Sequence, residues 1–140
     1  MKLLIAADGS DYTKKALAFL VTHEGLCGPG DELVVLNVQP PIPARVKRMV
    51  GASTVNDYHA EEANKVLKPI EKFLEKHKLH FKTVWAVGSA ANEVLNVASR
   101  EKTHLIVMGT HGHGLLGRAV MGSVAQRVMT EAEIPVLLVK

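Results

Sequence analysis

Five short apolar runs, separated by segments with helical signals, constrain the fold of this chain more than any other feature. The runs lie at residues 2–7, 32–38, 80–87, 105–108 and 134–139, and the third of them, read as a strand, also contains His80, Lys82 and Thr83. Nearly continuous apolar runs of this length are typical of strands that are covered on both faces of a parallel sheet. Right-handed crossovers place the intervening helices on both faces of such a sheet. We therefore expect one α/β domain over residues 1–140, with a five-stranded parallel sheet in three α/β/α layers.

The segments between the runs carry signals for helix starts and ends. Ser10 or Asp11 can cap a first helix, which the glycines of residues 25–30 are expected to end. Ser89 can cap a later helix, and the last helix is expected to cover residues 123–131.

Residues 40–56 are expected to form the longest irregular stretch, because three prolines lie near its start. The stretch also carries three basic residues, and it is either a binding loop or lid, or a solvated mobile loop. Residues 57–78 keep the apolar spacing of one amphipathic helix, which Pro69 should kink or divide. The basic residues are Arg45, Lys47 and Arg48.

Charge and composition argue against several classes of protein. The 140 residues carry a net charge of +3, with lysine and arginine spread along the chain, and only 4% are aromatic. Nucleic-acid binding is therefore not indicated. No apolar run approaches the ~20 residues needed to span a bilayer, and residues 1–7 resemble a buried strand more than a signal peptide. Cys27 is the single cysteine, which excludes an internal disulfide and fits a reducing cytoplasm.

A glycine-rich loop follows the fourth apolar run. Five glycines fall within the fourteen residues 109–122, far above the roughly 7% average. The bare N–H groups of such a loop can cradle phosphate oxygens, and Ser123 opens the next helix, whose N-terminus favours an anion. The segment therefore offers a phosphate site without a lysine. The alternative is that the glycines only make tight turns.

Two better-known phosphate loops do not fit this segment. The Gly-Lys-Ser/Thr ending of the Walker A loop is absent. Residues 112–117 match the string G-x-G-x-x-G, but they follow the fourth run instead of the first, so the dinucleotide fingerprint is discounted.

The spacing Gly109-x2-Gly112-x9-Gly122-Ser123 resembles the ATP-binding signature of the universal stress protein family. The resemblance covers the whole chain, including the end of the first run (AADGS) and the closing run (PVLLV). It implies a Rossmann-like sheet with the strand order 3-2-1-4-5. It also implies a nucleotide-dependent signalling or stress-response module with an unidentified protein partner.

The resemblance further implies a site for ATP, or for ADP or AMP, with Mg²⁺ or Mn²⁺. Asp8 should face the ribose or a phosphate-bound metal, or else act as a turn residue. The backbone of Val38 should recognise adenine, with Ala6 nearby, where many family members have proline. The ribose and phosphates should lie against the glycine loop, at Met108, Gly109, Gly112, Gly122, Ser123 and Val124.

No catalytic residue stands out. His111 and His113 can be metal ligands or bases, but no other residues complete a ligand set. We favour the interpretation that both are loop residues that lie next to a phosphate or in solvent. Arg118 can reach a phosphate or lie on the surface. Hydrolysis needs a positioned water, a metal and charge stabilisation. The sequence shows no catalytic lysine and no clear base, so we expect slow or absent turnover. The alternative is a slow ATPase, or a phosphoryl or nucleotidyl transferase, whose activity depends on Asp8.

The positions of the loops argue against two further classes of protein. A flavodoxin-like redox protein would need its phosphate loop after the first strand, where residues 9–13 match poorly. A phosphoacceptor domain would need an acidic residue after the third strand, where Val87 is followed by Gly88 and Ser89. The last run, residues 134–139, is apolar, and as an uncovered edge it predicts a homodimer through that strand.

Overall fold

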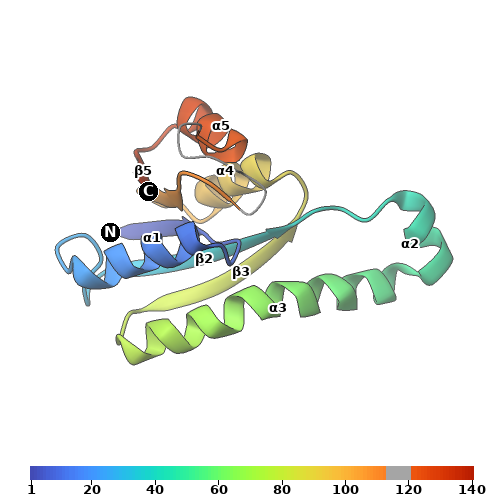
Figure 1. The fold of residues 1–140 in the computed structure, drawn as a ribbon, viewed down its shortest axis with the longest axis horizontal. Coiled ribbons are helices and arrows are strands. Elements are labelled where there is room, and N and C mark those ends of the chain that lie inside the picture. Colours follow the sequence, from blue (N-terminus) through green and yellow to red (C-terminus); the bar gives the residue numbers. More distant parts are fainter. Residues whose placement is uncertain (113–120) are drawn as a thin grey trace.

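Five parallel strands form a single sheet at the centre of the molecule in the computed structural model, which describes residues 1–112 and 121–140 (Figure 1). The order is β3-β2-β1-β4-β5, which confirms the expected order 3-2-1-4-5. The strands are β1 (Lys2–Ala6), β2 (Glu32–Gln39), β3 (Phe81–Val87), β4 (Leu105–Gly109) and β5 (Val136–Val139).

The register brings the carboxyl ends of three strands together. Ala6 of β1 pairs with Leu36 of β2, and Ile5 pairs with Val107 of β4. Since β1 lies between β2 and β4, the loops that follow these three strands leave the sheet side by side. In parallel α/β sheets, ligands bind at this edge, where the strand order reverses.

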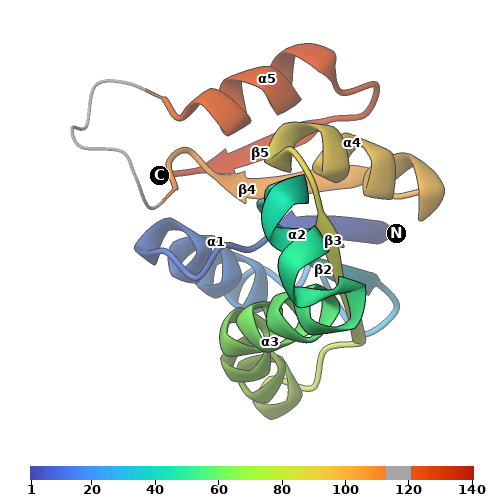
Figure 2. The same cartoon turned by 90° about the vertical axis from the view of Figure 1, so that its right-hand side faces the viewer.

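The helices cover both faces of the sheet, as the alternating pattern predicts (Figure 2). α1 and α3 lie on one face, and α4 and α5 lie on the other. No described helix has both the length and the apolar content to cross a bilayer. The helices are α1 (Asp11–Thr22), α2 (Ala44–Val50), α3 (Ala52–Lys76), α4 (Ala90–Arg100) and α5 (Ser123–Glu131).

The core is divided between the two faces because successive strand residues point in opposite directions. Leu3 and Ile5 pack into the cluster that includes α1 and α3, whereas Leu4 and Ile106 pack into the cluster that includes α4 and α5. All four side chains are fully buried. Each contributes about 1.5–3 kcal/mol of transfer free energy, so the sheet edge that holds the loops is rigidly supported.

The helix starts follow the sequence signals closely. Ser10 is the N-cap of α1, and its Oγ accepts a hydrogen bond from the N–H of Thr13 at 3.4 Å. Ser89 occupies the N-cap position of α4 without a side-chain cap bond. The last helix begins at Ser123 as expected, after the N-cap Gly122. α1 ends earlier than expected, at Thr22.

The expectation of an irregular stretch over residues 40–56 is wrong. α2 and the start of α3 are helical, and they are joined by Gly51, whose φ of +91° favours glycine. The prolines do not break a helix because they precede α2, and Pro43 is its N-cap, where a missing N–H costs little. Pro69 does not divide α3, which continues to Lys76. The buried residues on either side of it, Leu67 and Ile70, hold that face on the sheet.

Candidate functional site

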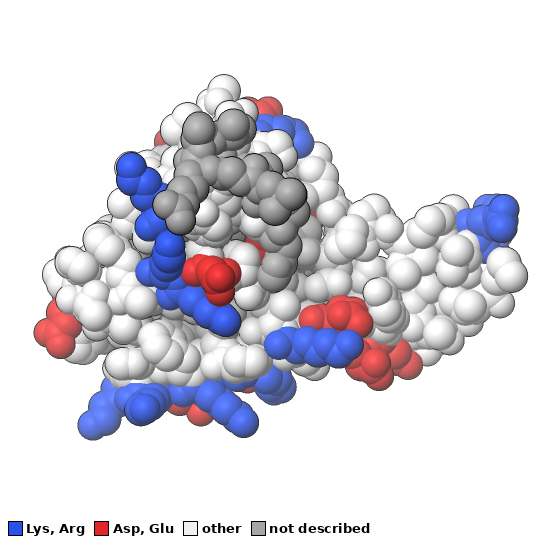
Figure 3. Space-filling model, viewed as in Figure 1, with Lys and Arg blue, Asp and Glu red and all other residues white. Residues whose placement is uncertain are grey.

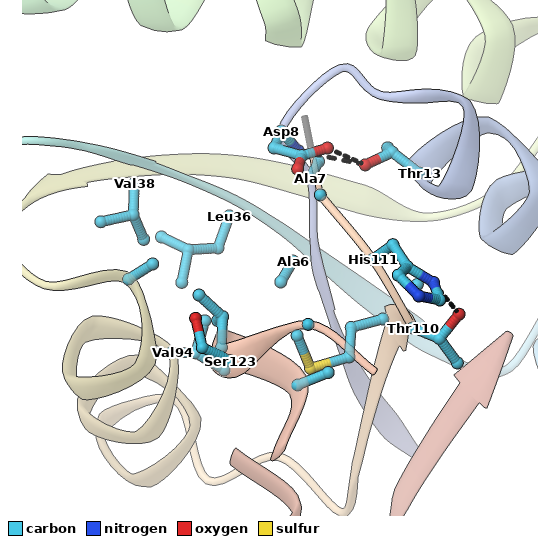
Figure 4. Close-up of a pocket in the computed structure, with 17 residues that line it drawn as sticks. Ala6, Ala7, Asp8, Thr13, Leu36, Val38, Val94, Thr110, His111 and Ser123 are labelled. Carbon is cyan, nitrogen blue, oxygen red and sulfur yellow. Dashed lines mark hydrogen bonds between the residues drawn. The ribbon is translucent and has the colours of Figure 1, made fainter. Parts of the chain in front are cut away.

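A cavity of about 430 Å³ lies at the carboxyl edge of the sheet (Figure 4). It is bounded by the ends of β1, β2 and β4 and by the first turns of α4 and α5. The structure brings together here all nine residues that the sequence analysis assigned to the nucleotide, although their individual roles stay predictions. They are Ala6, Asp8, Val38, Met108, Gly109, Gly112, Gly122, Ser123 and Val124.

One side of the cavity is an apolar slot. Leu36 and Val38 of β2 face it together with Ala6 of β1, and Val94 of α4 lies opposite (Figure 4). A slot lined by aliphatic side chains, with few polar groups, suits a flat heterocycle whose edge can bond to nearby backbone groups. The slot therefore has the character of a nucleobase site.

Asp8 stands at another side of the cavity and is held by the start of α1. Its Oδ1 accepts hydrogen bonds from the N–H of Ser10 at 2.9 Å and from the hydroxyl of Thr13 at 2.8 Å. The N–H of Asp8 in turn donates to the Thr13 hydroxyl at 3.1 Å. Thr13 is 3% exposed whereas Asp8 is exposed. The carboxylate is therefore presented to the cavity in a fixed orientation.

Gly109 and Gly112 allow the end of β4 to approach the start of α1 and the residue after β1 closely. A Cβ on Gly109 would lie 2.5 Å from the Cβ of Tyr12, so a larger residue would push α1 away from β4. A Cβ on Gly112 would lie 2.8 Å from Oδ2 of Asp8. The first glycine is thus required by packing, and the second by the neighbouring carboxylate.

The first turn of α5 supplies the polar end of the cavity. Its N-cap is Gly122, which carries no capping side chain, and Ser123 and Val124 follow on the cavity wall. The N–H of Gly122 donates to the carbonyl of Thr110 at 2.7 Å, so the helix start is tied to the end of β4. Free N–H groups and the partial positive charge of a helix N-terminus make this turn a suitable site for an anion.

His111 also lines the cavity, between the two glycines. Its Nδ1 lies 2.8 Å from the hydroxyl of Thr110, and its ring centroid lies 4.8 Å from that of Tyr12. The two other basic candidates, His113 and Arg118, lie outside the described residues.

A metal site made by the protein alone is not found in residues 1–112 and 121–140, where no three histidine, cysteine or acidic residues cluster. Asp8 is the one acidic residue among the described residues that line the cavity. A divalent cation bound here would therefore need oxygen ligands from a phosphate chain as well as from Asp8.

Several lining residues were not assigned to the site from sequence. Leu36 shares a strand face with Val38, so the two-residue period of a strand could have indicated it. Val94 is a buried helix residue whose orientation toward the cavity has no local sequence signal. The full set of such residues is Ala7, Thr13, Leu36, Ala90, Val94, Thr110 and Ala125.

Comparison with known proteins relates this architecture to one family. The universal stress protein family matches residues 1–140. Universal stress protein MJ0531 of Methanocaldococcus jannaschii is 32% identical over 142 residues, which cover 99% of this chain and 81% of that protein.

Two solved structures share the fold. The structure of MJ0577, from the same archaeon, has a TM-score of 0.84 at 28% identity and covers 99% of this chain and 94% of that one. A universal stress protein of Arabidopsis thaliana, solved with AMP bound, has a TM-score of 0.71 over 100% of this chain and 91% of that one. Its identity of 15% makes the likeness one of fold.

Proposed function

The chain belongs to the universal stress protein family, and we propose that it binds an adenine nucleotide, with ATP as the expected ligand, in the cavity at the carboxyl edge of the sheet. One observation carries the proposal: an apolar slot and an uncapped helix N-terminus line the same cavity of about 430 Å³. A nucleotide has the matching halves, a flat base and a charged phosphate chain. The AMP bound to the Arabidopsis relative is consistent with this ligand class.

The base is expected in the slot between β2 and α4. Leu36 and Val94 would cover its two faces, and the backbone of Val38, at the end of β2, would bond its edge. Burial of the base between aliphatic side chains provides affinity, and backbone groups provide the choice among bases.

The phosphates are expected at the start of α5. The N–H groups of Ser123 and Val124 lie in the first turn of this helix, and the Ser123 hydroxyl can donate to a phosphate oxygen. Gly112 and Gly122 leave the backbone bare on either side. The described residues would therefore hold the phosphates through backbone N–H groups and the helix dipole, since the loop signature contains no lysine.

Asp8 would hold the ribose or a cation bound to the phosphates. Its Oδ1 is already an acceptor for Ser10 and Thr13, so Asp8→Asn keeps the turn while removing the charge. We expect this variant to bind ATP about as well as wild type in EDTA and more weakly than wild type in Mg²⁺. Calorimetric titration in the two buffers measures the difference. Equal losses in both buffers would point to the ribose, and no loss in either would remove Asp8 from the site.

The nucleotide proposal is tested by calorimetric titration of nucleotide-stripped protein with ATP, ADP, AMP and GTP. We expect saturable binding of the adenine nucleotides, strongest for ATP, and weaker binding of GTP. Gly122→Val should weaken ATP binding about tenfold or more, ~1.4 kcal/mol, because its Cβ would lie 3.2 Å from the carbonyl oxygen of Thr110 and crowd the start of α5. The matched control is Gly30→Ala, at a glycine with open space around its Cα. No heat from folded, ligand-free wild type would contradict the proposal.

We further propose that β5 pairs with a second copy. All four of its residues are apolar and only half-buried, and it is the last strand on its side of the sheet. Exposed apolar edges favour strand pairing. Light scattering should show a lower mass for Leu137→Lys than for wild type; equal masses would contradict this assembly.

A further inference from the structure

α2 and the first turns of α3 project from the body of the molecule as an arm, defined here as residues 44–62 (Figures 1 and 2). No side chain of α2 is buried, and its N-cap Pro43 makes no side-chain cap bond. A helix of seven residues is not stable in water by its own propensity, because nucleation is costly and few bonds offset it. α2 contacts α3 of the same chain but buries none of its side chains there, so most of its surface is left for a further partner.

The arm carries most of the exposed apolar residues of the described chain. Met49 is 76% exposed, and Val46, Val50 and Tyr58 are 41%, 47% and 47% exposed. Of the seven exposed large hydrophobic side chains described, four lie on this arm. Apolar residues gathered on one projection, and not scattered singly, are typical of an interaction surface.

The charges along the arm have a simple order. Arg45, Lys47 and Arg48 lie on α2, and residues 40–56 contain no acidic residue. The next charged residues along α3 are acidic: Asp57, Glu61 and Glu62. Figure 3 shows basic side chains at the far end of the arm, acidic side chains with a basic one among them nearer the body, and uncharged surface between the two groups.

Two arms that run in opposite directions would have complementary charges along their length. If two arms lie antiparallel, the basic end of each faces the acidic segment of the other, and the uncharged residues 49–56 of the two copies meet in the middle. A two-fold axis produces this kind of pairing, in which the same patch is used on both copies. We propose that the arm is an interface between two copies of this chain, with α2 of one copy lying against the first turns of α3 of the other.

An anionic membrane surface fits the arm less well. The basic residues of α2 would be attracted to it, but Asp57 and Glu61 are exposed on the same projection and would be repelled. In the antiparallel pair, these carboxylates face the basic residues of the second copy. The charge pattern therefore favours a second copy over lipid.

Cysteine cross-linking tests the pairing in the full chain. Ser53 lies between the basic and acidic groups and is exposed, so Ser53→Cys places a thiol near the expected two-fold axis. The native Cys27 is buried, and burial raises the pKa of its thiol, so it should not compete. The matched control is Lys72→Cys, exposed on the same helix but outside the arm. Under mild oxidation we expect the first variant to form a disulfide dimer at least about tenfold faster than the second, a ratio equivalent to ~1.4 kcal/mol.

Charge reversal then identifies the contact. In the Ser53→Cys background, reversing the basic residues (Arg45→Glu, Lys47→Glu, Arg48→Glu) should abolish most of the cross-linking. Reversing the acids (Asp57→Lys, Glu61→Lys) should do the same, and a mixture of the two proteins should restore it. Neither set touches the core or β5, because these side chains are all exposed, and circular dichroism checks that the variants fold.

Three results would overturn the proposal. One is equal cross-linking of the Ser53→Cys and Lys72→Cys proteins, which a dimer through β5 alone would give. Another is failure of the mixed charge-reversed proteins to cross-link. The third is a Ser53→Cys protein that does not cross-link while wild type co-sediments with phosphatidylglycerol vesicles, which would assign the arm to lipid.

Discussion

The two ends of the sheet use charge in opposite ways. At the amino end, Lys2 Nζ lies 3.4 Å from a carboxylate oxygen of Glu101 and 3.8 Å from one of Glu32, and Lys82 also pairs with Glu101. The N-terminal ammonium donates to Asp31 at 2.7 Å. At the carboxyl end, the cavity is lined by aliphatic side chains, bare glycines and a helix N-terminus, with Asp8 as its acidic residue among those described.

This difference separates stabilisation from binding. Charges at the amino end are satisfied by neighbouring elements of the chain itself, so they stabilise the fold by small amounts and offer little to a ligand. At the carboxyl end, the backbone dipoles of α5 have no side-chain cap. They are the groups that an anionic ligand would satisfy. Substitutions of the charged residues at the amino end should therefore change stability and leave affinity unchanged. Substitutions at the carboxyl end should change affinity.

The largest effect is expected at Gly109, where a substitution should lower both the stability of the fold and the affinity for ATP. Gly109→Val should lower the free energy of unfolding by about 1–3 kcal/mol and abolish ATP binding, because its Cβ would lie 2.5 Å from that of Tyr12 and force α1 away from β4. Chemical denaturation and calorimetry measure the two losses. Gly30→Ala is the control, and a stable Gly109→Val protein with normal affinity would show that this packing does not shape the site.

A loss confined to binding is expected at Gly112. In Gly112→Ala, the new Cβ would meet Oδ2 of Asp8 at 2.8 Å, a carboxylate that can shift without disturbing the core. We expect the dissociation constant for ATP to rise about tenfold, with an unchanged melting temperature. If the melting temperature fell as far as in Gly109→Val, the distinction between packing and binding glycines would be wrong.

A smaller loss is expected at Ser123. Ser123→Ala removes one hydroxyl donor from the phosphate end, which is worth about 0.5–1.5 kcal/mol, or roughly twofold to just over tenfold in affinity. The helix itself should be unaffected because Gly122, not Ser123, is its N-cap. Affinity for AMP should change less than affinity for ATP if the hydroxyl bonds the outer phosphates. Equal changes for the two nucleotides would place the bond at the α-phosphate.

The smallest effect is expected at the amino end, and it depends on pH. A hydrogen bond from Lys82 lowers the pKa of Glu101, and one from the N-terminal ammonium lowers the pKa of Asp31. Carboxylates with depressed pKa values stabilise the fold above their unfolded pKa, about 4, and lose this contribution as pH falls through the folded pKa. The Asp31→Asn, Glu101→Gln double variant should therefore melt slightly below wild type near neutral pH, with the gap closing under acid conditions.

The same double variant supplies the cleanest contrast with the carboxyl end. Its affinity for ATP should equal that of wild type, because none of the substituted groups lines the cavity. A melting-temperature gap that stays constant into acid, or a change in affinity, would mean that the two ends are not independent.

The sequence predicts the sheet and most helix starts because their signals are local. Apolar runs identify the strands, and Ser10 and Ser123 mark the starts of the helices that frame the cavity. The glycine spacing identifies the loop at the cavity because a Cβ on Gly109 would meet Tyr12 and a Cβ on Gly112 would meet Asp8.

What the sequence does not predict depends on tertiary contacts. α2 buries no side chain, so it leaves no amphipathic pattern, and the prolines before it suggest a loop. Val94 enters the cavity only because α4 crosses the end of β2, which no spacing along the chain reveals. The orientation of Asp8 likewise depends on Thr13, five residues later.

Backbone nuclear magnetic resonance of the 15.2 kDa chain during titration with ATP and Mg²⁺ is the most direct test of the nucleotide site. We predict large shifts for the amides of Val38, Ser123 and Val124, and none for Lys2, Glu32 and His104 at the opposite end of the sheet. Shifts confined to the amino end, or no shifts at saturating ATP in a folded and nucleotide-free sample, would contradict the assignment of the carboxyl-edge cavity as a nucleotide site.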